Sequence, residues 1–154
     1  MNYMIFASIK IMREIKFRGW NGKNKKWIYG YYFVNRGEHF ISPDEVVNPL
    51  VSYDDFVVDK DSIGQYTGLK DKNGVEIYEG DILQELPRGE YAEATGIPLF
   101  ELEDLPADGG RMVSVVYDAP SFEFAPNEYG YIFLNNPHLF RVIGNVHENQ
   151  RRKL

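Results

Sequence analysis

The sequence predicts a mainly β protein, built as one compact and strongly bent sheet, with a β-rich α+β fold as its variant. Two observations favour strands over helices. The 154 residues include 11 Tyr and 10 Phe, and aromatic residues, like the Val and Ile around them, fit pleated sheets better than helices. Short apolar runs also alternate with turn-forming Gly, Asn and Asp, which is the pattern of an antiparallel sheet.

The N-terminal part predicts a hairpin and a third strand. Apolar and largely basic side chains alternate over residues 15–20 with the period of a strand. The polar run 21–26 is a turn, and residues 27–34 resume as the second strand. A short strand is expected over residues 39–42, whereas residues 44–62 carry no clear signal.

The middle of the chain, residues 63–83, specifies its turns sharply. Asp71 begins and Gly74 ends a four-residue segment of the kind that forms a tight turn. Gly80 supplies a second position that is free to take a positive φ. The segment 78–83 resembles a strand entry of small SH3-like barrels, which makes such a barrel the alternative architecture. This likeness concerns the fold and carries no function with it.

A long acidic insertion follows over residues 85–110. It contains Pro, paired Gly and only two short hydrophobic groups, at residues 97–100 and 102–105. A helix over residues 89–95 and an irregular excursion between two strands are both consistent with this composition.

The C-terminal part predicts four further strands and a basic tail. The strands are expected over residues 112–117, 121–124, 130–134 and 140–147, and the tail over residues 150–153. No internal repeat occurs, so a single domain is expected over residues 12–154. Residues 1–11 precede the dense pattern that follows Met12, and we interpret them as a leader whose origin the sequence does not indicate.

The formal net charge of −6 conceals an asymmetry along the chain. Residues 1–36 hold eight Lys or Arg and one Glu, residues 37–108 hold four basic and eighteen acidic side chains, and residues 109–154 hold five and four. The division is consistent with an electrostatic binding face, but we prefer the interpretation that two parts of one domain attract each other.

The composition also indicates the cellular compartment. There is no Cys, which excludes disulfides and a thiolate nucleophile and fits a reducing environment, so we expect the cytoplasm of a host cell. The longest apolar run near the start covers about seven residues, against the roughly twenty that cross a bilayer. No membrane partner is therefore expected, while a homo-oligomer is compatible with the sequence.

Three blocks carry a resemblance to a known family. They are IKFRGW with the later KNKKW, then IGQYTGLKDKNGVEIYEGDIL, and finally VIGNVHEN. In this order they resemble the YopX family of phage and prophage proteins. The resemblance implies a mostly β fold and supplies no catalytic residue. We expect structural roles for the matching positions, which are Gln65, Tyr66, Thr67, Gly68, Leu69, Asp71, Gly74, Tyr78, Glu79, Gly80, Asp81, Gly144, Asn145, Glu148 and Asn149.

The basic and aromatic start is the clearest sign of a binding surface. Its cations could contact phosphates, and its rings could stack on unpaired bases. The same rings could equally belong to the core. The candidate nucleic-acid-binding residues are Arg13, Lys16, Arg18, Trp20, Lys23, Lys25, Lys26 and Trp27.

No pattern in the sequence identifies a reaction. Neither a strand–turn–helix nucleophile elbow nor a phosphate-cradling Gly-rich loop is present. The carboxylates Glu76, Glu79 and Asp81 could line a Mg²⁺ site, but Asp81 fits a turn position at which a carboxylate accepts backbone N–H groups. We therefore predict no catalytic residue, no resident metal and no cofactor.

The function predicted from these observations is binding. The leading hypothesis is a non-enzymatic phage or prophage accessory protein that acts on a host or phage protein. The first alternative is single-stranded nucleic-acid binding through the basic and aromatic start. The second alternative is a metal-dependent enzyme that processes nucleic acids, built on Glu76, Glu79 and Asp81.

Overall fold

The computed structural model describes residues 14–43, 52–118, 121–127, 130–133 and 136–151. Its described part is rich in strands, as predicted, and they form two antiparallel five-stranded sheets. The predicted leader over residues 1–11 and Arg13 lie outside the described residues, and the single domain over residues 12–154 stays a prediction.

The first sheet has the strand order β3-β2-β1-β4-β5. The predicted hairpin is confirmed, with Trp20 opposite Trp27. The bounds are β1 Phe17–Asn21, β2 Lys26–Asn35, β3 Glu38–Ser42, β4 Gly64–Lys70 and β5 Glu76–Tyr78. Two short 3-10 turns, η1 Tyr53–Asp55 and η2 Lys60–Ser62, lie in the stretch that the sequence left unassigned.

The long strand β2 pairs with β1 through its first half and with β3 through its second half. Gly30 lies where the pairing changes, with φ at 149°. A Cβ atom at this position would approach the carbonyl oxygen of Ser42 to 2.0 Å. Only glycine fits here, because the two backbones run too close together for any side chain.

The second sheet has the strand order β10-β6-β7-β8-β9. Its bounds are β6 Asp81–Glu85, β7 Met112–Asp118, β8 Ser121–Asn127, β9 Gly130–Phe133 and β10 Phe140–Asn145, with the 3-10 turn η4 at Pro137–Leu139. The described residues therefore form two sheets and not the closed SH3-like barrel that was the alternative architecture.

The hydrophobic core of the described residues consists of two clusters. Ile28, Ile41 and Val58 are buried beside β1–β3. A larger cluster joins the second sheet to β5 of the first, and consists of Ile77, Leu83, Val113, Val115, Leu139 and Phe140. Packing of Ile77 against the second sheet means that the two sheets share this core.

The last predicted strand is too long. It ends at Asn145, and Val146–Arg151 forms helix α2, so the strand assignment of Val146 and His147 and the tail assignment of residues 150 and 151 are wrong. The side chain of Asn145 explains the change, because its Oδ1 accepts the backbone N–H groups of His147 (3.1 Å) and Glu148 (3.0 Å). This is the geometry of an N-cap.

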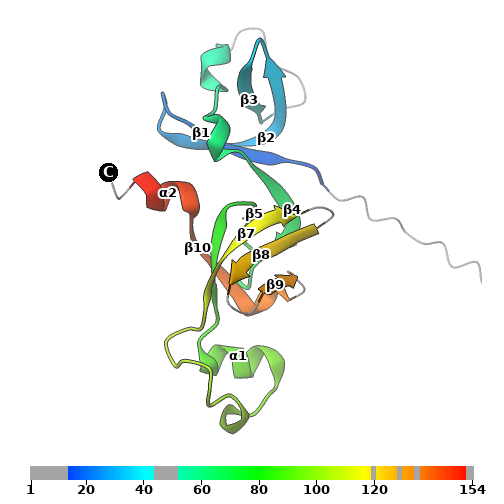
Figure 1. Cartoon of the computed structure of the whole chain (residues 1–154), viewed down its shortest axis with the longest axis vertical. Coiled ribbons are helices and arrows are strands. Elements are labelled where there is room, and N and C mark those ends of the chain that lie inside the picture. Colours follow the sequence, from blue (N-terminus) through cyan, green and yellow to red (C-terminus); the bar gives the residue numbers. More distant parts are fainter. Residues whose placement is uncertain (1–13, 44–51, 119–120, 128–129, 134–135, 152–154) are drawn as a thin grey trace, which may run out of the picture.

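The acidic insertion is partly helical. Helix α1 covers Arg88–Thr95 and confirms the helix considered for residues 89–95, and a 3-10 turn η3 follows at Leu99–Glu101. The insertion lies at one end of the molecule, and β1–β3 lie at the other (Figure 1). In the described part of the chain, no helix is both long and apolar enough to cross a membrane.

Candidate functional site

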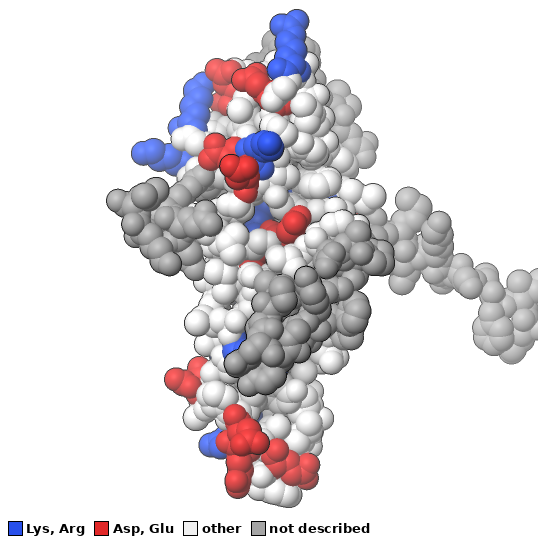
Figure 2. All heavy atoms as spheres, viewed as in Figure 1, with Lys and Arg blue, Asp and Glu red and all other residues white. Residues whose placement is uncertain are grey.

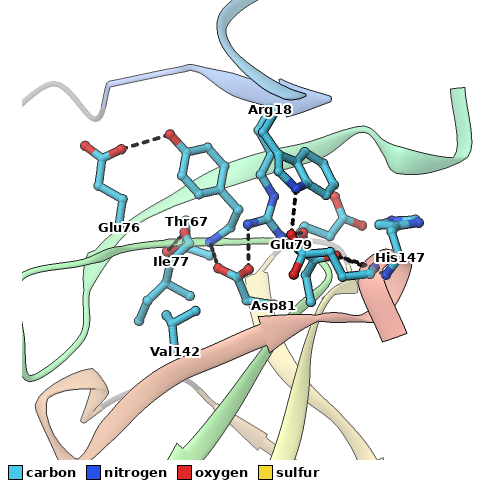
Figure 3. Close-up of polar contacts among 12 residues, drawn as sticks. Arg18, Thr67, Glu76, Ile77, Glu79, Asp81, Val142 and His147 are labelled. Carbon is cyan, nitrogen blue, oxygen red and sulfur yellow. Dashed lines mark hydrogen bonds and ion pairs between the residues drawn. The ribbon is translucent and has the colours of Figure 1, made fainter. Parts of the chain in front are cut away.

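The three sequence blocks meet where the two sheets join, which we call the junction. Arg18 reaches across from β1 of the first sheet toward Asp81 at the start of β6 in the second (Figure 3). Trp27 on β2 and Glu148 on α2 complete the set of contacts. Residues that are 63 and 121 positions apart thus lie side by side, which sequence spacing could not reveal.

The centre of the junction is a buried ion pair. Arg18 Nη1 lies 2.6 Å from Asp81 Oδ1, and only 7% and 1% of the two side chains are exposed. Arg18 Nη2 also donates to the carbonyl oxygen of Glu79 (3.2 Å), and Asp81 Oδ2 accepts the backbone N–H of Tyr78 (2.8 Å). Burial raises the pKa of Asp81 above its ordinary value, and the charge of Arg18 opposes that rise.

Aromatic rings enclose the guanidinium group. Its central carbon lies 5.0 Å from the ring centre of Trp27 and 5.1 Å from that of Tyr78. Both separations are within the range of cation–π attraction. Trp27 Nε1 in turn donates to Glu148 Oε1 (2.8 Å), so the helix capped by Asn145 is connected to the first sheet. The ring of His147 lies against Trp27 at 6.2 Å.

A second ion pair lies beside the first. Lys16 Nζ lies 2.6 Å from Glu76 Oε1, while the Tyr78 hydroxyl donates to Glu76 Oε2 (2.8 Å). Burial alone would raise the pKa of Glu76, but the two hydrogen bonds outweigh it and the net pKa is lowered. Burial and the bond to Glu76 both raise the pKa of the Tyr78 hydroxyl.

A cavity of about 370 Å³ opens at the junction, between Tyr29 of the first sheet and Asn145 of the second. The charged groups on its wall already have partners inside the protein: Arg18 with Asp81, Glu76 with Lys16, and Glu148 with Trp27. The pair of Arg18 with Asp81 joins the two sheets, that of Lys16 with Glu76 lies at the first sheet, and that of Trp27 with Glu148 attaches α2. None of these contacts requires a ligand.

The Asp71 turn attaches the middle block to the last strand. Asp71 Oδ1 accepts the N–H groups of Asn73 (2.7 Å) and Val75 (2.9 Å), and Oδ2 accepts that of Val142 (2.9 Å) on β10. Gly74 takes a φ of 79° and confirms the predicted tight turn.

The other family-motif positions have mostly backbone and packing contacts. Thr67 Oγ1 donates to the carbonyl oxygen of Ile77 (2.8 Å), and Leu69 packs against the larger core cluster. The ring of Tyr66 lies 5.4 Å from that of Tyr78, and the carbonyl oxygen of Gln65 accepts the N–H of Glu79. The remaining positions are Gly68 and Gly80, which have positive φ, Gly144 next to an irregularity in β10, and Asn149 in α2.

The predicted nucleic-acid residues that the structure describes fall into two groups. Lys16, Arg18 and Trp27 belong to the junction, and Trp20 packs edge-on against Trp27 with ring centres 5.7 Å apart. Lys23 and Lys25 lie on the exposed turn between β1 and β2, and the exposed Lys26 is the first residue of β2. Lys23 pairs with Asp54 (3.1 Å).

The three carboxylates considered for a metal have separate roles. Glu76 pairs with Lys16 and Asp81 with Arg18, whereas Glu79 contributes its carbonyl oxygen to Arg18. Among the residues that the structure describes, no group of three or more His, Asp or Glu side chains is arranged to hold a metal ion.

A second candidate site, which sequence reasoning missed, lies on the insertion. Large apolar side chains are exposed just after α1: 36% of Ile97, 56% of Leu99 and 71% of Phe100. Next to them is a groove of about 500 Å³ between Tyr91 of α1 and Leu105. We call the three apolar side chains and this groove the insertion surface. The hydrophobic groups were visible in the sequence, but their exposure was not.

The charge around the insertion surface is negative. Figure 2 shows mainly Asp and Glu at the end of the molecule that carries α1, while Lys and Arg project among acidic groups at the opposite end. Glu101 and Asp104 line the groove, and no ion pair forms at either residue within the described ranges. Unlike the junction, the insertion surface presents uncompensated charge beside exposed apolar groups.

Together these features define a strand-rich protein of two antiparallel sheets that are joined by a buried ion pair and carry an acidic insertion. The model of the YopX protein family matches residues 16–152. The chain therefore belongs to the YopX family, as the three blocks indicated.

A solved structure shares the fold. The crystal structure of protein EF1440 from Enterococcus faecalis is 24% identical in sequence, with a TM-score of 0.53, and the similarity covers 92% of this chain and 99% of EF1440. A comparison with curated protein sequences finds no match.

Proposed function

We propose that the protein is a non-enzymatic binding protein that recognises another protein, from the host cell or from a phage, through the insertion surface. The observation that carries this proposal is the exposure of Leu99 and Phe100 beside unpaired carboxylates. Single exposed apolar residues are common, but several together on a protruding segment are typical of interaction sites. Buried aromatic anchors supply much of the energy in protein interfaces.

The junction supports the same proposal indirectly. The charged groups of the junction are paired with partners inside the protein. The junction therefore has a structural role: it keeps in place the two sheets from which the insertion projects. The strand β6 enters the insertion and β7 leaves it, and both pack in the core that the two sheets share. The absence of Cys supports action in the cytoplasm.

The test is capture followed by reconstitution. The full chain and a Leu99→Ser/Phe100→Ser variant would each be used to capture proteins from host cells, and a captured protein would be identified, purified and titrated against both. We expect at least a tenfold loss of affinity in the variant, or about 1.4 kcal/mol. The matched control is Val34→Ser, an exposed apolar residue on β2. Equal affinity of all three chains would refute the proposal.

The nucleic-acid alternative has narrower support. Its basis is the exposed turn with Lys23, Lys25 and Lys26, at which Lys25 and Lys26 have no ion pair within the described part. The test is fluorescence anisotropy of labelled single- and double-stranded oligonucleotides at low and moderate salt. Salt-sensitive binding that is lost on charge reversal of these lysines would establish it, and no binding at low salt would dismiss it.

A further inference from the structure

The groove on the insertion surface has a defined shape. Tyr91, Leu102 and Leu105 are half-buried and form its apolar part. Backbone hydrogen bonds hold its walls: Arg88 N–H to the Pro106 carbonyl (3.2 Å) and Leu105 N–H to the Leu102 carbonyl (3.0 Å). A groove fixed in this way loses little conformational freedom when it is filled, which favours binding.

The chemistry of the groove is apolar in its walls and anionic at its rim. Glu101 and Asp104 are exposed carboxylates on its lining. The cation on the lining, Arg111, pairs with Glu85 (3.5 Å), so these two charges offset each other. From Arg88 to Asp108 the sequence holds six Asp or Glu and one basic residue. One of the six, Glu90, is neutralised by Lys72 and by Arg141 (3.6 Å). The rim therefore attracts cations, and repels nucleic acid and acidic proteins.

We propose that the groove binds a basic amphipathic segment of a partner protein, with an apolar side chain placed between Tyr91 and Leu105 and flanking Lys or Arg beside Glu101 and Asp104. This inference rests on the proposed function and specifies the partner's chemistry. Charge complementarity selects the segment and speeds its encounter, while the apolar anchor supplies most of the affinity. The groove volume of about 500 Å³ lies within the usual range of ligand-binding pockets, about 300–1,000 Å³.

The experiment uses three labelled peptides of equal length, titrated against the full chain by fluorescence anisotropy. The first combines Leu and Phe with Lys, the second replaces each Lys by Glu, and the third keeps Lys but replaces Leu and Phe by Ser. We expect the first to bind at least tenfold more tightly than the other two. Equal affinity of the first and third peptides would overturn the proposal, because it would show that the groove attracts any cationic peptide and does not recognise an apolar side chain.

Two protein variants locate the binding. Glu101→Gln with Asp104→Asn should weaken the first peptide about tenfold and reduce its salt dependence. The matched control, Glu38→Gln with Asp61→Asn, removes two exposed carboxylates at the other end of the molecule and should leave binding unchanged. An equal effect of both pairs would also overturn the proposal.

The remaining outcomes separate this inference from the proposed function. Capture of a partner that depends on Phe100, without binding of the first peptide, would overturn the basic segment and leave the binding function standing. Self-association that is lost in Glu101→Gln/Asp104→Asn, measured by sedimentation, would overturn it in favour of a second copy of the chain.

Discussion

The junction and the insertion surface use the same residue types in opposite ways. At the junction, Asp81 is buried and faces a buried Arg18 across two sheets. On the insertion surface, Glu101 and Asp104 face solvent beside exposed Leu99 and Phe100. A buried, paired charge specifies how the parts of one chain fit together, whereas an exposed, unpaired charge can act on another molecule. Substitutions should therefore separate stability from binding.

The largest effect is expected from Asp81→Asn. The substitution removes the carboxylate charge and leaves the Arg18 guanidinium buried without its counter-charge, so the free energy of unfolding should fall by about 3–5 kcal/mol. Urea denaturation followed by tryptophan fluorescence measures the loss. Glu103→Gln, on the insertion, is the control and should change stability by less than about 0.5 kcal/mol. A similar small change in Asp81→Asn would show that the pair does not join the sheets.

A smaller loss is expected at the cap of α2. Asn145→Ala removes the acceptor for the N–H groups of His147 and Glu148, and should cost about 1 kcal/mol in the same denaturation experiment. Asn145→Asp keeps an acceptor oxygen and should retain most of the stability. If both variants lost equal stability, loss of the helix cap would not explain the destabilisation of Asn145→Ala.

The pH dependence should reveal the ion pair of Glu76 with Lys16. Because the folded-state pKa of Glu76 is lowered from 4.5, its stabilisation is complete above about 4.5 and is lost as the pH falls through the lowered value. Wild type should therefore lose stability relative to Glu76→Gln on acidification from pH 6 to pH 3, by denaturation at each pH. A difference that stays constant over this range would contradict the assignment.

The smallest effect on folding is expected at Phe100. Because 71% of the residue is exposed, Phe100→Ser should change the free energy of unfolding by no more than about 0.5 kcal/mol, while it weakens partner binding. Thermal unfolding monitored by circular dichroism tests the first part. A large loss of stability would place Phe100 in the folded core and remove the contrast between the two regions.

The local part of the fold could be predicted from the sequence, and the contacts between distant segments could not. The alternation over residues 15–20 and the turn from Asp71 to Gly74 are local signals. The structure has the turn, and it has the strand with bounds shifted to Phe17–Asn21. The alternation also placed Arg18 on a basic face, but whether that face meets solvent or a buried carboxylate depends on residue 81. Single-strand patterns contain no such information.

The end of the last strand could have been found. Asn145 followed three residues later by Glu148 is a common signal for the start of a helix, and the apolar pattern that continues through Val146 concealed it. The insertion surface was harder to predict, because the hydrophobic groups at residues 97–105 are equally consistent with a buried and an exposed position. Exposure is decided by what packs over them, and that is a property of the fold.

The ends of the insertion are tied together where it leaves and rejoins the sheet. The N–H of Glu85 bonds to the carbonyl oxygen of Arg111 (3.0 Å), and that of Gly110 bonds back to Glu85 (3.2 Å). The entropic cost of closing a loop rises only slowly with the length of the loop. A segment held at both ends in this way can therefore be exchanged for another of different length and sequence. The two-sheet body is thus a scaffold onto which new recognition loops can be grafted.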